Sequence, residues 1–255
     1  SRRRPSAPWR CGSPRRRSGA AGAGRGHIAK TRLLIAGSQV AVTSVLIIGG
    51  VLLTRSFVAN MSADRGYDPA NVLTATVPFP GGRSFEWRQQ ARARIVERLV
   101  SRPGITHAAF STGVPLMSAG GYTSFTMPSP AGGAEVQVES IRRVVTPGYF
   151  GALGVRVRAG RPIADTDVAG SPTAVVVNRS FVRRYLDDLP IERAIGVSIG
   201  DQAVRGTSYA GTATIVGVTD DLRQDTVDAP DQPEMFVAMA QLTEASQPGS
   251  ATIIV

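Results

Sequence analysis

The segment Gly24–Thr31, GRGHIAKT, comes close to the phosphate-binding loop G-x-x-x-x-G-K-[ST], but Ala29 occupies the position of the second glycine. A phosphate loop needs a buried strand before it, a helix after it, and glycines that let backbone N–H groups close on the phosphates. The preceding residues, GSPRRRSGAAGA, cannot form a core strand, and the following run is too apolar for a half-exposed helix. We therefore predict that this segment does not bind ATP.

Acid–base and metal chemistry have few candidate residues. The chain has two histidines, His27 and His107, which excludes a histidine-based metal cluster or a catalytic arrangement of two histidines in the folded region. His107 lies in the apolar run ITHAAF and is interpreted as a structural residue. Cys11 is the single cysteine, so a disulfide framework is excluded. We predict no catalytic, cofactor-binding or metal-binding residues, and hence no enzyme.

Carboxylates are densest near the C-terminus, but their spacing does not fit a calcium loop. We interpret this stretch, which Arg223 and two prolines interrupt, as a solvated loop. Its acidic residues are Asp220, Asp221, Asp225, Asp228, Asp231 and Glu234. The sequence Asp165-Thr166-Asp167 is expected to cap a turn. In VTPGYFGALGV we expect Tyr149, Phe150 and Leu153 to fill the core.

The positive charge is concentrated at the N-terminus. Residues 1–32 contain nine arginines and Lys30 and no acidic residue, whereas residues 33–255 contain 19 basic and 19 acidic residues. A segment rich in Arg, Gly, Ser and Pro without periodic apolar residues has too little to bury. We predict that residues 1–32 form a disordered basic tail. Since the remainder is neutral, no nucleic-acid partner is predicted for the folded part.

The run Leu33–Thr54, LLIAGSQVAVTSVLIIGGVLLT, contains 22 residues without a charge. As a helix it would span about 33 Å, against a hydrocarbon core of about 30 Å. This length predicts a transmembrane helix, the alternatives being a buried core helix, a secretory signal peptide or a weak twin-arginine signal. Gly37, Ala41 and Ser44 would give it one face small enough for close helix contact.

Flanking charges predict the orientation of that helix. Lys30 and Arg32 precede it directly, whereas the arginines behind it, Arg55 and Arg65, are balanced by Asp64 and Asp68. The positive-inside rule therefore places the tail in the cytoplasm and residues after about 56 outside. In this interpretation Lys30 is an orientation charge.

Residues 67–255 have the pattern of an α+β domain that is richer in strand than in helix. Trp87, Ala91, Ile95 and Leu99 recur every four residues and predict a helix with arginines on its other face. The expected helices are Ser84–Ser101, Pro147–Leu153 and Arg179–Leu186. The expected strands are Asn71–Val77, Ile105–Ser111, Tyr122–Met127, Val136–Val145, Thr173–Val177, Thr214–Val218, Met235–Ala238 and Thr252–Val255.

An ordered set of segments across residues 31–255 carries a family resemblance. They are TRLLIAGSQVAVTSVLIIGGVLLTRSF, GYDPANVLTATV, RPGITHAAFSTGVPL, VTPGYFGALGVRVRAGRPI, AVVVNRSFVRRYL, TIVGVTDDLRQ and PEMFVAMAQ. In this order they resemble the permease subunits of MacB-type ABC transporters, and in particular their MacB-like periplasmic core domain. The usual P-I-G-[KR] turn of that family is Pro190-Ile191-Glu192-Arg193 here, which lacks the permissive glycine.

The resemblance implies one N-terminal transmembrane helix followed by a periplasmic domain with two parts. A split βαβ porter-like part would comprise residues 67–113 and 233–255, and an inserted strand-rich part residues 114–232. Three further helices follow in such proteins, so we expect the chain to be truncated before them. Two strands make a marginal sheet, so Met235–Ala238 and Thr252–Val255 are expected to complete the sheet of the porter-like part.

The implied function is that of a permease component in the bacterial inner membrane. Its implied partners are a cytoplasmic ABC ATPase on a separate chain, a periplasmic adaptor, membrane lipid, and a second copy or related chain in a dimer. An anchored single-pass binding or sensor domain without an ATPase is the alternative, and a periplasmic enzyme is a third hypothesis.

Overall fold

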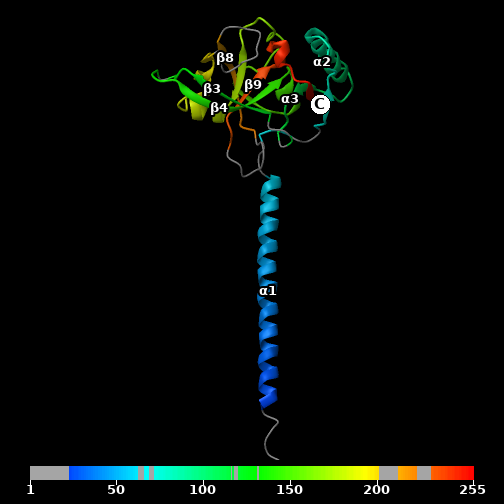
Figure 1. The fold of residues 1–255 in the computed structure, drawn as a ribbon, viewed down its shortest axis with the longest axis vertical. Helices are drawn as coiled ribbons and strands as arrows, with labels where there is room; N and C mark the ends of the chain where they lie inside the picture. Colours follow the sequence, from blue (N-terminus) through cyan, green and yellow to red (C-terminus); the bar gives the residue numbers. More distant parts are fainter. Residues whose placement is uncertain are drawn as a thin grey trace, which may run out of the picture. The chain divides into compact units, whose positions relative to one another are not determined.

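The computed structural model describes residues 23–62, 66–68, 72–115, 117, 120–130, 132–200, 212–222 and 231–255. The chain divides into two compact units, residues 1–61 and 62–255. We describe each unit separately. The N-terminal unit is one long helix, and the C-terminal unit is an α+β domain built on a single sheet (Figure 1).

Helix α1 comprises Ala23–Ser62. Its segment Lys30–Ala59 is long and apolar enough to cross a membrane, and none of the most apolar stretch is buried in the structure. These residues therefore do not form a buried core helix. Two side chains within the apolar run bond to the helix backbone, Ser38 Oγ to Ile35 O at 2.9 Å and Thr54 Oγ1 to Gly50 O at 2.8 Å. These bonds satisfy hydroxyl groups that lipid could not.

The helix is longer than the predicted run at both ends. Hydropathy locates the membrane-crossing part but does not set where the helix ends, and residues 23–62 contain no proline that would interrupt it. The expectation of disorder was wrong for residues 23–32, which are helical, while residues 1–22 lie outside the described residues. The backbone of Gly24–Thr31 is helical too, so it does not form the strand-to-helix loop that phosphate binding requires.

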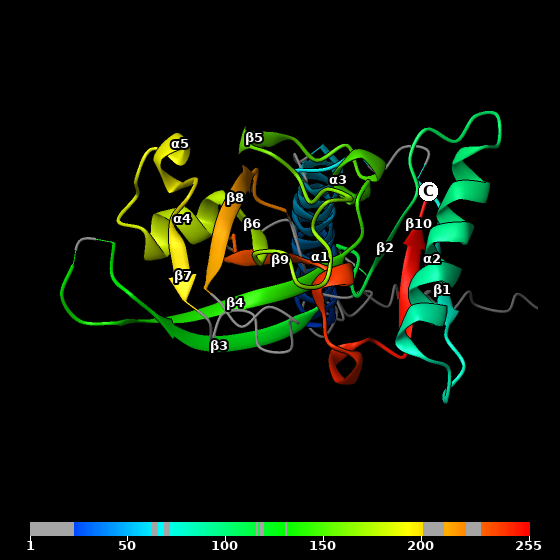
Figure 2. The same cartoon turned by 90° about the horizontal axis from the view of Figure 1, so that it is seen from above.

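The domain contains one ten-stranded sheet with the order β1-β10-β2-β4-β9-β6-β8-β5, in which β3 pairs with β4 and β7 with β8 (Figure 2). Parallel and antiparallel pairs are mixed, because β4 pairs with β9 and β6 with β8 in parallel. The strands are β1 Thr74–Pro78, β2 Ala109–Ser111, β3 Gly121–Met127, β4 Val136–Val145, β5 Val157–Gly160, β6 Ala174–Asn178, β7 Ser198–Gly200, β8 Ala213–Thr219, β9 Glu234–Ala238 and β10 Ser250–Ile254.

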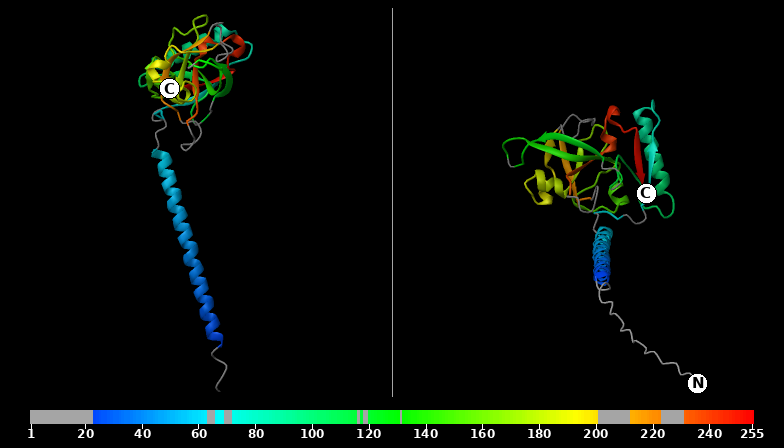
Figure 3. Two further views of the ribbon diagram at one scale, coloured as in Figure 1. Left: turned by 90° about the vertical axis from the view of Figure 1, so that its left-hand side faces the viewer. Right: turned by 60° about the horizontal axis from the view of Figure 1, so that its bottom comes forward.

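A split βαβ unit forms one end of the sheet. Helix α2, Phe85–Val100, connects β1 to β2, and β10 lies between these two strands, antiparallel to both. The end of β10 lies beside β1 and α2 (Figure 3). The last strand of the chain thus completes this unit, as predicted. The expectation was wrong for β9, which pairs with β4 and β6 in the middle of the sheet because all five of its residues are buried.

Short helices cover the two faces of the sheet. Helices α3 Tyr149–Ala152, α4 Arg179–Tyr185 and α5 Ile191–Ala194 follow β4, β6 and α4 respectively. On one face Tyr149 and Phe150 pack on Phe236, with ring centroids 5.8 and 5.1 Å away. On the other face Phe181 and Tyr185 of α4 join the cluster against which α2 packs. The predicted core role of Tyr149, Phe150 and Leu153 is confirmed, since all three are buried.

Several local predictions need correction. The segment Pro190–Arg193 is not a turn but begins helix α5, so the glycine of the usual family pattern is not needed at Glu192. Residues 105–108 lie outside β2. The short elements β5, β7 and α5 have too few residues to show a period and were not predicted.

Helix α2 also orients two side chains differently from the prediction. Ala91, Ile95 and Leu99 pack against the core, but Trp87 is 38% exposed. Arg92, which was expected on the outer face with the other arginines, is 2% exposed. A spacing of four residues advances about 40° per step beyond a full turn, since the helix has 3.6 residues per turn. A stripe that begins at Leu99 and Ile95 therefore reaches Arg92 and leaves Trp87 outside.

Candidate functional site

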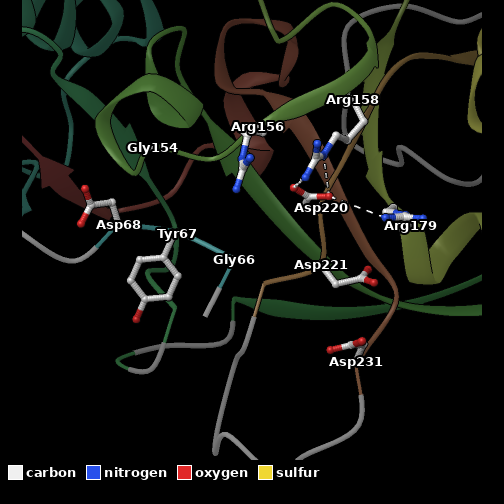
Figure 4. Close-up of a pocket in the computed structure, with 10 residues that line it drawn as sticks. All are labelled: Gly66, Tyr67, Asp68, Gly154, Arg156, Arg158, Arg179, Asp220, Asp221 and Asp231. Atoms are coloured by element: carbon white, nitrogen blue, oxygen red, sulfur yellow. Dashed lines mark hydrogen bonds and ion pairs between the residues drawn. The ribbon is translucent and has the colours of Figure 1, made fainter. Parts of the chain in front are cut away.

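A charged cavity of about 580 Å³ lies among segments that are distant in sequence (Figure 4). It is formed by the segment 66–68, the loop after α3, strand β5, the start of α4, the end of β8 and the approach to β9. Its lining residues are Gly66, Tyr67, Asp68, Gly154, Arg156, Arg158, Arg179, Asp220, Asp221 and Asp231. The cavity therefore combines three guanidinium groups with four carboxylates.

Asp220, directly after β8, is the centre of one ion-pair group. Arg158 Nε donates to both of its carboxylate oxygens at 2.8 Å, and Arg158 Nη2 lies 2.7 Å from Asp220 Oδ2. Arg179 Nη1 lies 4.0 Å from Oδ1 of the same carboxylate (Figure 4). The bidentate geometry fixes the orientation of β5 relative to β8. The ion pair adds little to the stability of the fold, because the arginine side chain remains 40% exposed.

Asp221 ties the next residue of the chain to helix α4. Its Oδ1 accepts a hydrogen bond from the backbone N–H of Ser180 at 2.7 Å, and its Oδ2 accepts one from Arg183 Nη2 at 3.0 Å. Arg183 also lies 3.6 Å from Asp231, just before β9. A carboxylate at the first turn of a helix is favoured by the helix dipole. Through these bonds Asp221 and Asp231 hold α4 to the ends of two strands.

The segment 66–68 is seated against this group. The backbone N–H of Asp68 donates to Leu153 O at 2.9 Å. Gly66 has a φ of +75°, and a Cβ at this position would overlap the carbonyl oxygen of Asp221. Gly66 is therefore required both for its left-handed backbone and for its close approach to β8. The result is a defined contact between the segment that follows α1 in sequence and the charged edge of the sheet.

A second polar group is buried inside the sheet. Arg143 Nη2 of β4 donates to Glu234 Oε1 of β9 at 2.9 Å, and both side chains are 0% exposed. Asn178 Oδ1 accepts hydrogen bonds from the backbone N–H groups of Glu234 at 2.9 Å and Phe181 at 3.0 Å. Burial, assisted by the charge of Glu234, raises the pKa of the nearby Tyr149 phenol, which therefore stays neutral.

The acidic stretch near the C-terminus is not uniformly a solvated loop. Glu234 is fully buried, and Asp220, Asp221 and Asp231 form ion pairs, while Asp225 and Asp228 lie outside the described residues. The prediction was wrong for Glu234 because its partner, Arg143, is far away in the sequence. In the part of the chain that the structure describes, no group of three or more His, Cys, Asp or Glu side chains could hold a metal.

The two remaining candidate residues, Asp167 and His107, make contacts that belong to the fold. Asp167 caps a turn as predicted: its Oδ2 accepts from the backbone N–H of Ala164 at 2.8 Å, and Arg161 bonds to both of its oxygens at 2.8 Å. His107 is exposed and lies before β2 rather than within it. Its ring packs so closely on Gly151 that a Cβ there would overlap it.

Together, the fold and the site define an α+β domain that follows a long apolar helix and whose charged cavity is lined in part by the segment adjoining that helix. The chain belongs to the family of MacB-like periplasmic core domains, whose sequence profile matches residues 32–255. This family membership makes it a MacB-type ABC transporter permease.

Three solved structures are similar to this chain. The periplasmic region of MacB from Actinobacillus actinomycetemcomitans has a TM-score of 0.45 and 16% identity, covering 75% of this chain and 76% of that one. The extracellular domain of the noncanonic ABC-type transporter YknZ from Gram-positive bacteria has a TM-score of 0.41 and 14% identity, covering 72% and 82%. A domain of a permease protein from Porphyromonas gingivalis has a TM-score of 0.40 and 14% identity, covering 76% of each. No curated protein matches the sequence.

Proposed function

We propose that this chain couples a cytoplasmic ATPase on another polypeptide to movement of its own periplasmic domain, in export or in mechanotransmission. In this proposal α1 crosses the bacterial inner membrane with its N-terminus in the cytoplasm and residues after about 60 in the periplasm. The ten positive charges before the apolar run support that orientation. A periplasmic adaptor, membrane lipid and a second copy or related chain in a dimer are the further proposed partners.

The observation that carries the proposal is the way in which residues 66–68 are held against the domain. We call this contact the seat. Residues 63–65 alone separate this segment from α1 in the sequence. The Asp68–Leu153 hydrogen bond and the close approach of Gly66 to Asp221 leave the segment little freedom relative to α3 and β8. Because the chain is covalently continuous, a displacement of α1 reaches the domain through this seat, from which ion pairs lead to β5 and α4. The coupling would be mechanical, with no chemistry in this chain.

The test is a matched pair of glycine variants in the membrane-embedded protein. A fluorophore on a cysteine introduced by Arg193→Cys, in a Cys11→Ser background, would report movement of the domain. With the co-purified ATPase we expect a fluorescence change on adding ATP. Gly66→Val should abolish that change while leaving the ATPase bound, because the new side chain cannot occupy the seat.

Gly81→Val is the control, since a Cβ at Gly81 meets nothing within 4 Å. It should preserve the ATP-dependent change. Failure of any ATPase to co-purify would contradict the proposed partner. An unchanged response in Gly66→Val would contradict the proposed route through the seat.

A further inference from the structure

Helix α2 and its two ends carry an unusual concentration of arginine. Between residues 83 and 102 there are six arginines and two glutamates. Among the described residues, none of these six forms an ion pair, whereas Arg143, Arg158, Arg161, Arg179 and Arg183 all do. The six are Arg83, Arg88, Arg92, Arg94, Arg98 and Arg102.

The outer face of α2 presents an aromatic residue together with these charges. Its inner face packs on the core through Ala91, Ile95 and Leu99, so Trp87 and Arg94 are turned away from the sheet. The guanidinium of Arg83 lies 5.1 Å above the centre of the Trp87 ring, and that ring is 38% exposed. Helix α2 covers β1 and β10 at one end of the sheet, and none of the described strands and helices of the C-terminal unit lies over its outer side (Figure 2).

The arrangement costs the domain stability. In three pairs of arginines the two members are four residues apart: 88 with 92, 94 with 98 and 98 with 102. Like charges at this spacing repel each other on a helix. Arg92 is 2% exposed, lies 4.6 Å from the Phe79 ring centre, and bonds to Gln247 Oε1 at 2.7 Å rather than to a carboxylate. Burial, then the charge of Arg88, lowers the pKa of Arg92 to about 10. The domain thus keeps a repulsive cluster that an external acidic group would relieve.

We propose that the outer face of α2, from Arg83 to Arg102, is a docking surface for a clustered acidic segment of a separate protein. Guanidinium groups bind carboxylates in a bidentate geometry. Tryptophan and arginine are also the residues that contribute most to protein interfaces. The proposal stands on α2 alone and does not require that an ATPase drives the domain.

Two other occupants fit this face less well. A helix that binds a lipid surface buries an apolar face in it, but the apolar face of α2 is already used by the core and leaves Trp87 alone outside. A second copy of this chain offers exposed carboxylates such as Glu135, Glu139, Asp165 and Glu244, but they are spread over several segments and do not form one acidic cluster. Its Asp167, Asp220, Asp221, Asp231 and Glu234 bond to its own arginines, and its exposed Asp187, Asp188 and Glu192 are interleaved with Arg184 and Arg193.

Trp87 provides a local readout. Trp9 is the other tryptophan, so in a Trp9→Phe background the fluorescence of the membrane-embedded chain reports α2 and ignores binding to the basic tail. The protein would be held in nanodiscs of phosphatidylcholine and titrated with a hexaglutamate peptide. We expect a saturable change in Trp87 emission that Arg94→Glu/Arg98→Glu weakens at least tenfold and that hexaglutamine does not produce.

Arg184→Glu/Arg193→Glu is the matched control, because it removes the same charge from the other end of the domain, at α4 and α5 (Figure 2). It should leave the titration unchanged. Equal weakening by both double variants, or no response to millimolar peptide, would overturn the proposal. A Trp87 change caused by phosphatidylglycerol nanodiscs, or by raising the protein concentration alone, without a peptide response, would assign the face to lipid or to a second copy instead.

Discussion

The arginines of the sheet and the arginines of α2 have opposite effects on the stability of the domain. Around the charged cavity and inside the sheet each ion-paired arginine connects two segments, as Arg158 connects β5 to Asp220 and Arg143 connects β4 to Glu234. On α2 the same side chain meets like charges on the next turn. The difference indicates that the first group serves the fold, whereas the second group is retained at a cost to it. Substitutions in the two groups should therefore differ in sign as well as in size.

The largest effect is expected at the buried pair. Glu234→Gln leaves the Arg143 guanidinium charged and without its carboxylate inside the sheet, and should lower the free energy of unfolding by about 3–5 kcal/mol. Chemical denaturation of the purified protein in detergent would measure it. Glu139→Gln, on an exposed side chain of β4, the strand that also carries Arg143, is the control and should change little. If Arg143→Met/Glu234→Met were as unstable as the single variant, the loss would come from packing rather than from an unpaired charge.

A smaller effect is expected at Asp167, where stability should depend on pH. Burial opposes ionisation of this carboxyl, but Arg161 and the Ala164 N–H outweigh it and hold its pKa below the usual value. A depressed pKa contributes stability that is present above the unfolded pKa of about 3.9 and is lost as pH falls through the lower folded value. Asp167→Asn should therefore cost about 2 kcal/mol near pH 7.

The same variant should approach the parent protein in stability as pH falls below about 4. Denaturation curves at several pH values would test this convergence. Asp165→Asn, two residues earlier and exposed, should show no such pH-dependent difference. A constant gap between Asp167→Asn and the parent at all pH values would mean that the ionised carboxylate is not what stabilises the turn.

The sequence predicted the elements of this fold better than their partners. Strand β4 was predicted over its full length, and Ser84 caps α2 by accepting a hydrogen bond from the Trp87 backbone N–H. These features depend on local patterns of apolar and capping residues. The Arg143–Glu234 and Arg158–Asp220 pairs join residues 91 and 62 positions apart. Nothing in the neighbourhood of Glu234 in the sequence distinguishes it from the other acidic residues of the same stretch, Asp220, Asp221 and Asp231.

The candidate site shows the same limit. Gly66 follows a charged stretch and has no local signal that a second chain segment approaches it, so its role depends on the carbonyl of Asp221, which only the fold brings near. The division of residues 67–255 into a porter-like part and an insertion remains a prediction, because β9 connects both groups of strands into one sheet.

A modest loss is expected at the cavity. Arg158→Ala should lower the free energy of unfolding by about 0.5–1 kcal/mol, because its ion pair with Asp220 is bidentate but open to water. A double-mutant cycle with Asp220→Asn would isolate the pair. Arg156→Ala removes a neighbouring exposed arginine of the same cavity and should change stability by less than about 0.5 kcal/mol. Equal losses for both would show that the cavity does not distinguish a paired arginine from its neighbour.

The smallest effect, on α2, has the opposite sign. Arg94→Gln keeps a good helix former and a long side chain but removes the repulsion from Arg98 one turn later. The exposed hydrogen bond from Arg94 to Gln90 that is also lost contributes little, since water replaces it. We expect the free energy of unfolding to rise by about 0.3 kcal/mol at low salt. The gain should vanish near 1 M salt, where the screening length falls to about 3 Å.

Arg193→Gln on α5, which has no arginine one turn away, should show no gain at either salt concentration. If Arg94→Gln instead destabilised the domain as much as Arg158→Ala does, the arginines of α2 would be serving the fold after all, and the contrast between the two regions would be wrong.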